Sequence, residues 1–182
     1  ETFREVLASQ GIPVYCTSRT GYFSALEIVT VLNYLKVCDN PLQDIPLMGV
    51  LRSPIVGCSS QELAELRIQY PKGMLYESIV EYVREQEGIF AENGDLPDTG
   101  EVPVGCDIRE NEKLRKLRGF LNLLERVREM AAYTPVHELI LFVLKETGYG
   151  NYARALPGGE QRYANLSMLV EKAMDYEKTS YR

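Results

Sequence analysis

The sequence predicts a mainly α-helical fold, on three observations. Apolar residues recur at helical spacing in most segments, residues that favour helix starts precede several of these segments, and only one short stretch has the composition of a β-strand. Of the 182 residues, 45% are hydrophobic and 25% are charged, which is typical of a globular protein rather than a disordered one. We therefore expect a folded domain with a core of its own.

The beginning of the chain combines a helix with a strand. Residues 2–10 place apolar side chains on one helical face, Gly11 ends that helix, and the β-type run from Ile12 to Cys16 follows. A lone strand cannot pair its own backbone, so this stretch suggests the edge of a sheet that other residues complete. We expect the sequence to be a piece of a longer protein.

Four helices are expected between this edge and the middle of the chain. Ser24 is a candidate N-cap of the first helix, whose inward stripe begins at Leu26, and Phe23 is expected in the core. Either Ser59 or Ser60 would cap the third helix. The expected helices cover residues 23–37, 44–51, 61–70 and 75–85.

Three more helices are expected in the C-terminal part. The longest spans 112–132, and its inward stripe consists of Leu114, Leu117, Leu121, Leu124 and Val127. Its other faces carry the basic residues Lys113, Arg115, Lys116, Arg118, Arg126 and Arg128. A helix from Pro135 to Gly148 would have His137 at the surface of its first turn and Leu141 in its apolar pattern. The last helix covers 163–177.

The net charge of −6 is unevenly distributed along the chain. Residues 73–112 contain eleven acidic and two basic residues, whereas residues 113–182 contain eight acidic and twelve basic ones. Within the acidic part, residues 87–110 are rich in Gly, Pro and Asp and predict a loop-rich excursion at the surface. This excursion is either a solvated loop or a docking surface for a partner protein.

The sequence lacks the motifs of a self-sufficient active site. It has no G-x-x-x-x-G-K-[ST] loop for ATP phosphates, no G-x-S-x-G nucleophile motif, and a single histidine, His137. The four cysteines lack zinc-ligand spacing and are expected as buried thiols, and no metal site is predicted. Neither a membrane-spanning run nor a signal peptide is visible, so we expect a cytoplasmic domain without a cofactor of its own.

Three stretches resemble one family of DNA helicases. Residues 11–57 are similar to the segment of superfamily one helicases, of the UvrD, PcrA, Rep and RecB class, that leaves the second motor domain and enters its inserted 2B subdomain. Residues 114–149 and 159–182 follow in the same order as in that family. The stretches LRSPIVG, LKETGY and GEQRYANL are most similar to the AddA subunits of bacterial AddAB helicase/nucleases.

This resemblance implies a domain division and a function. Residues 1–21 would form the edge of the second motor domain, and residues 22–182 a multi-helix 2B-like subdomain with the acidic excursion at 87–110. The parent protein would use ATP and Mg²⁺ to unwind and degrade DNA in double-strand-break repair and recombination, together with an AddB-type partner subunit. This chain would be non-catalytic, and it would contact duplex DNA nonspecifically or position the motor domains.

The resemblance also singles out a turn for contact with duplex DNA. In related helicases a P-x-R-G-I-G turn meets phosphates, and here Val56 and Ser59 replace its arginine and its second glycine. A purely structural turn is therefore the alternative, as a solvated face is for the basic helix. The candidate DNA-binding residues are Arg52, Ser53, Gly57, Ser59, Ser60, Lys116 and Arg118.

A second group of residues matches the helicase family near the motor junction. Tyr22, Phe23 and Glu27 correspond to an aromatic stretch before the pair Glu-Ile, and Arg162 and Asn165 correspond to an R-x-x-N-L stretch that packs the closing helix. The resemblance implies a structural hydrogen-bond network for the last two residues rather than DNA contact.

Two other classes of function remain open on the sequence alone. The chain could be a stand-alone helical protein-interaction module, with the acidic residues 73–112 as its docking surface. A helix-turn-helix regulator is less favoured, because no helix after a short turn carries the Arg, Asn or Gln cluster that reads base edges.

Overall fold

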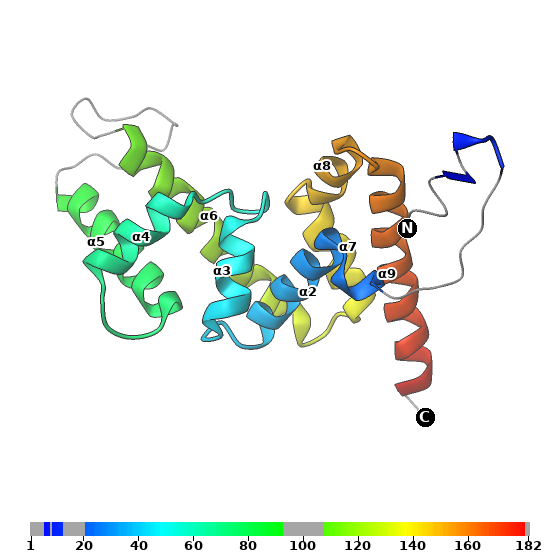
Figure 1. Ribbon diagram of the computed structural model, residues 1–182. Coiled ribbons are helices and arrows are strands. Elements are labelled where there is room, and N and C mark those ends of the chain that lie inside the picture. The colour runs from blue at the N-terminus through cyan, green and yellow to red at the C-terminus, as the bar shows by residue number, and fades with distance from the viewer. Residues whose placement is uncertain (1–5, 8, 13–20, 93–107, 181–182) are drawn as a thin grey trace.

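The computed structural model describes residues 6–7, 9–12, 21–92 and 108–180. In these residues it contains one 3₁₀ helix and eight longer α-helical elements, which are labelled in Figure 1 where there is room. The elements are η1 (Tyr22–Ser24), α2 (Leu26–Asp39), α3 (Asp44–Arg52), α4 (Ser60–Gln69), α5 (Leu75–Glu92), α6 (Ile108–Ala131), α7 (Val136–Glu146), α8 (Tyr149–Ala155) and α9 (Gly159–Ser180). The prediction of a mainly α-helical fold is confirmed.

Some predicted features fall wholly or partly outside the described residues. The β-type run lies there except for Ile12, and so do residues 93–107 of the predicted acidic excursion. The division of the chain at residue 21 stays a prediction. No helix in the described part of the chain has the length and apolar character needed to cross a membrane.

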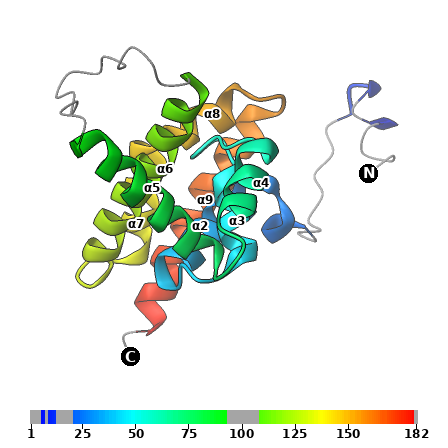
Figure 2. The ribbon, with the colours of Figure 1, turned by 90° about the vertical axis from the view of Figure 1, so that its left-hand side faces the viewer.

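The helix α2 lies at the centre of the fold. Ile28 and Val31, near its beginning, pack with residues of α7, α8 and α9 in one hydrophobic cluster, whereas Tyr34 and Val37 pack with residues of α3 to α7 in a second cluster. Figure 1 shows α3 to α5 on one side of α2 and α8 and α9 on the other. In Figure 2, which looks from the side of α4 and α5, α2 and α9 lie behind these helices.

The start of α2 differs from its prediction. Residues 22–24 form a separate 3₁₀ helix, so the N-cap of α2 is Ala25 and not Ser24. Leu26 and Phe23, both predicted to face inward, are 66% and 60% exposed. The extra turn moves the helix start, and burial on two sides selects Ile28 and its neighbours instead of the predicted stripe.

The helices that flank the acidic residues are longer than predicted. α5 continues to Glu92 and α6 already begins at Ile108, so both ends of the predicted excursion at 87–110 are helical. The sequence pattern ended these helices early because their outer turns carry few apolar residues that would mark a buried face.

The packing between α5 and α6 includes a buried lysine. Tyr82 of α5 is fully buried, as predicted, but Lys113 of α6, predicted on a solvated face, is only 6% exposed. Its ammonium Nζ lies 4.5 Å from the centroid of the Tyr82 ring, which is a cation–π contact. A long aliphatic stem and an aromatic partner thus explain why this charge could be buried.

The C-terminal helices show one addition and two corrections. The short helix α8 was not predicted, and Gly148, with a φ of 65°, separates it from α7. Leu141 is 47% exposed, because Ile140 and Val143 form the buried face of α7. His137 is not a free surface residue, since its side chain is 20% exposed and is bonded to Glu177 of α9.

Candidate functional site

Residues 52–60 form a tight turn between α3 and α4. The hydroxyl of Ser53 is buried, donates to the carbonyl of Val50 at 2.7 Å and accepts from the backbone N–H of Ile55 at 3.3 Å. Gly57 has a φ of 76°, a conformation that a side chain would strain. Both residues therefore shape the turn, and the Ser53 hydroxyl has no lone donor left for a ligand.

The N-terminus of α4 already has an anion of its own. The hydroxyl of Ser59 accepts from the backbone N–H of Glu62 at 3.1 Å, and the Glu62 carboxylate accepts from the backbone N–H of Ser59 at 2.5 Å. This reciprocal pair is a capping box. A helix N-terminus attracts phosphates through its free amides and its dipole, but here a carboxylate takes that place.

The two candidate lysine and arginine residues of α6 are paired with carboxylates. The Nζ of Lys116 lies 3.2 Å from Glu62 and 3.0 Å from Glu112, and the Nε of Arg118 lies 3.1 Å from Glu87. Desolvation lowers the pKa of Lys116, but its bonds to both carboxylates outweigh this effect and raise the pKa. A phosphate contact by either cation would have to compete with these pairs.

Arg52 is the exposed cation of the turn. Its guanidinium donates a hydrogen bond to the hydroxyl of Ser60, at the first position of α4, and no carboxylate pairs with it in the described part of the chain. Arg52 and Ser60 are therefore the members of the candidate DNA-binding set that keep polar groups at the surface without an ionic partner.

The residues that match the motor junction come together in space. The buried carboxylate of Glu27 in α2 accepts from Arg162 at 2.8 Å and from Asn165 at 2.7 Å, both in α9. We call Glu27, Arg162, Asn165 and Tyr22 the junction network. Tyr22 completes it, because its hydroxyl donates to the backbone carbonyl of Asn165 at 2.9 Å.

The aromatic pair before α2 lies beside this network. The rings of Tyr22 and Phe23 meet edge to face with centroids 5.0 Å apart, and the ammonium of Lys172 lies 5.8 Å from the Tyr22 centroid. Burial, assisted by the negative charge of Glu27, raises the pKa of Tyr22. Tyr22 is thus held as a neutral donor, while Phe23 presents its ring to solvent.

The described residues contain no group of three or more His, Cys, Asp or Glu side chains that could hold a metal ion. Cys38 and Cys58 are free thiols, partly and fully buried, and burial raises their pKa values to about 12 and about 11. Such thiols are poor nucleophiles at neutral pH. A shallow hollow of about 600 Å³ lies on the outer face of α5, remote in sequence from the junction network.

Two functional contacts were missed by sequence reasoning. The Ser59 and Glu62 spacing is the S-x-x-E signature of a capping box, so it could have been recognised. The pairing of His137 with Glu177 joins residues 40 positions apart and has no local signal.

Comparison with known proteins gives the chain its relatives. No family model matches it. The A subunit of an ATP-dependent helicase/nuclease from Lachnoclostridium phytofermentans is 41% identical along the whole chain. The proteins of the same name from Bacillus velezensis and a Thermoanaerobacter species are 43% and 38% identical over 98% and 99% of it.

The relatives are much longer than this chain, which spans 13 to 15% of their length. An alignment of the whole chain to a part of a longer protein weighs against a stand-alone interaction module. The identity of about 40% extends over both hydrophobic clusters and the junction network alike. Along its length, the chain is therefore the counterpart of one segment of AddA, the A subunit of the ATP-dependent helicase/nuclease.

Proposed function

We propose that this segment is a non-catalytic 2B-like insertion of an ATP-dependent DNA helicase and nuclease, and that its task is to position the motor domains. The observation that carries the proposal is the junction network, in which Glu27 of α2 binds Arg162 and Asn165 of α9. An inserted subdomain leaves its host and returns to it, so its first and last helices have to lie together. The junction network supplies such a tie between helices at opposite ends of the segment.

The chemistry of the network suits a geometric role. Glu27 is 4% exposed, and each of its carboxylate oxygens has a donor from α9. A buried ion pair contributes little net stability, because desolvation offsets much of the attraction, but breaking one partner away is costly. The network therefore fixes one arrangement of α2 on α9 more than it stabilises the fold. Fixed helix ends would transmit force between the motor and the insertion.

Direct contact with duplex DNA is a secondary part of the proposal. The Lys116 and Arg118 cations have carboxylate partners, and the Glu62 carboxylate caps α4 where a phosphate would approach. Any contact through the turn then depends mainly on Arg52, with Ser60 beside it. One exposed arginine fits weak and nonspecific binding, in which each phosphate contact adds a salt-dependent increment.

The wider activity belongs to the parent protein. We propose that it hydrolyses ATP with Mg²⁺, unwinds and degrades DNA ends in double-strand-break repair and recombination, and works in the cytoplasm with an AddB-type partner subunit. The support is the printed function of the relatives, helicase and nuclease, and the absence of a phosphate-binding loop from this sequence. The motors and the nuclease would lie elsewhere in the parent.

The test uses the full-length subunit with its partner. Glu27→Gln keeps the size and one acceptor oxygen but removes the charge that pairs with Arg162. We expect ATP hydrolysis stimulated by single-stranded DNA to stay within about twofold of wild type, because the motors are untouched, and duplex unwinding to fall about fivefold or more, as loss of a buried charge pair permits. Glu160→Gln, an exposed carboxylate in the first turn of α9, is the control and should change neither rate.

Two outcomes would contradict the positioning role. Unchanged unwinding in a folded Glu27→Gln protein would show that the tie is dispensable. An equal fall in ATP hydrolysis and unwinding would place Glu27 within the catalytic cycle of the motor itself.

A further inference from the structure

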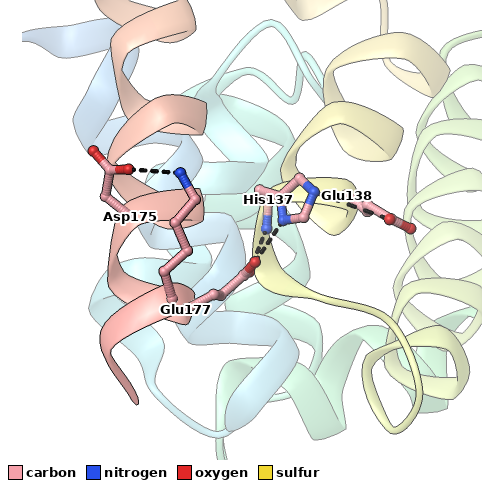
Figure 3. Close-up of polar contacts among 5 residues, drawn as sticks. His137, Glu138, Asp175 and Glu177 are labelled. Atoms are coloured by element: carbon pink, nitrogen blue, oxygen red, sulfur yellow. Dashed lines mark hydrogen bonds and ion pairs between the residues drawn. The ribbon is translucent and has the colours of Figure 1, made fainter. Parts of the chain in front are cut away.

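The beginning of α7 is capped by a residue from another helix. Its N-cap is Pro135, which has no side-chain hydrogen bond to offer the helix. The carboxylate of Glu177, near the end of α9, takes this role: Oε1 accepts from the backbone N–H of His137 at 3.0 Å, and Oε2 lies 2.6 Å from the Nδ1 of the same histidine. Figure 3 shows the Glu177 side chain reaching from α9 to both nitrogens.

The imidazole lies between two carboxylates. Its other nitrogen, Nε2, lies 3.9 Å from the Oε1 of Glu138, and the side chains of His137 and Glu177 are 20% and 18% exposed. In the described part of the chain these two acids are the ionic partners of His137, and Glu177 has no other basic partner. Asp175 and Lys178 form a separate, exposed pair within α9 (Figure 3). The charge of this cluster therefore depends on whether the ring is protonated.

The tie lies where α9 loses its other support. Leu166, Leu169 and Val170 are buried in the cluster around α2, but beyond Met174 the side chains of α9 are partly or fully exposed. The hydrogen bonds of Lys178 and Thr179 stay within α9 itself. Glu177 is therefore the polar contact that holds the last turns of the helix to the rest of the fold.

We propose that His137 and Glu177 form a proton-dependent latch that holds the last turns of α9 on the start of α7, tight when the imidazole is protonated and loose when it is neutral. This inference does not rest on the proposed helicase role. Its basis is the geometry of one histidine that bridges two helices and two acids.

The direction of the effect follows from the donors on the ring. A protonated imidazole has two N–H donors and a positive charge, so it can serve Glu177 and Glu138 together, whereas the neutral ring has one N–H. Histidine ordinarily changes its charge between about pH 5 and pH 8. Partial burial raises the pKa of Glu177, but hydrogen bonds from the His137 backbone and ring outweigh it and lower the pKa, so the carboxylate stays charged over this range.

Hydrogen exchange in the full-length subunit tests the latch. Peptides that cover residues 174–180 are compared at pH 6 and pH 8, after correction for the intrinsic exchange rate. We expect protection about fivefold higher at pH 6, the difference between a charge-assisted and a neutral hydrogen bond. Asp175→Asn is the matched control, because Asp175 lies on the same helix but does not touch α7, and it should keep the wild-type difference.

Two variants separate the latch from a purely structural cap. His137→Gln supplies an amide donor that does not titrate, and we expect its protection to be the same at both pH values. Glu177→Gln keeps an acceptor oxygen without charge, and it should also lose the pH response, which keeps the test valid if the first variant folds poorly. The proposal is overturned if wild type shows no difference between the two pH values, or if either variant keeps the full difference.

Discussion

Glu27, in the first turn of α2, accepts a hydrogen bond of 2.8 Å from Arg162, which lies 135 positions later in the chain, in α9. The acceptor is buried and the donor is partly exposed. This pair joins helices that belong to opposite ends of the segment. The arrangement in which an insertion meets its host is thus fixed by a polar contact, while the two hydrophobic clusters hold the remaining helices.

The purified segment should show no catalysis of its own. The sequence lacks a phosphate-binding loop for ATP, and no set of metal-binding carboxylates occurs in the described residues. We expect no ATP hydrolysis above background with single-stranded DNA present, and no cleavage of a labelled duplex with Mg²⁺. Turnover of ATP that DNA stimulates would be incompatible with the non-catalytic role.

Two sets of substitutions should separate the candidate DNA contacts. In the full-length protein, Arg52→Ala should make the log–log salt dependence of duplex binding shallower by about one unit, because one phosphate contact is lost. The double change Lys116→Ala with Arg118→Ala should leave that slope unchanged, since both cations are already paired with carboxylates. The opposite pattern would move the DNA footprint from the turn to the face of α6.

The capping box of α4 should matter for stability and for its pH dependence. Ser59→Ala should lower the free energy of unfolding by about 1 kcal/mol, whereas Ser60→Ala, one residue later and outside the box, should change it by less than about half of this. Denaturation in urea measures both. Equal effects of the two serines would refute the role of the box.

The same box predicts a loss of stability in acid. Burial raises the pKa of Glu62, but hydrogen bonds from Ser59 and Lys116 outweigh it, so the pKa in the folded state lies below the ordinary 4.5. A lowered pKa contributes stability above about pH 4.5, and this contribution is lost as the pH falls through the folded-state value. Between pH 5 and pH 3 the wild type should therefore lose more stability than Glu62→Gln.

A buried tyrosine offers a substitution that should not harm the fold. The hydroxyl of Tyr34 has no hydrogen-bond partner and its side chain is fully buried, and this burial raises its pKa. Tyr34→Phe removes an unsatisfied polar group, so the free energy of unfolding should stay equal or rise by about 1 kcal/mol. Tyr133→Phe, at a residue 92% exposed, is the control and should be neutral. A clear loss of stability in Tyr34→Phe would mean that its hydroxyl is bonded, for example to a buried water.

The sequence predicted much of the helical architecture but little of its rotation. Long amphipathic segments such as α6 were found because their apolar stripe is continuous, and Leu114, Leu117, Leu124 and Val127 are buried as expected. The stripe of α2 was wrong at Leu26, because a helix buried on two sides has no single apolar face. The short helix α8 was missed, since seven residues are too few for a periodic signal.

The candidate site was predictable only in part. The resemblance to helicases singled out Glu27, Arg162 and Asn165 separately, and the fold brings them within hydrogen-bonding distance. The carboxylate partners of Lys116 and Arg118 were not visible, because Glu62 and Glu87 come from other helices and such pairs depend on tertiary packing. Charge along one helix does not reveal whether it is free or neutralised.

The most direct test of the positioning role is a double-mutant cycle on base pairs unwound per ATP hydrolysed, in the full-length subunit with its partner. The cycle compares wild type, Glu27→Gln, Arg162→Gln and the double variant. If Glu27 and Arg162 act as one tie, each single change should lower the ratio about fivefold and the double change should lower it no further. Independent, multiplying losses, or a ratio that none of the variants changes, would contradict the account.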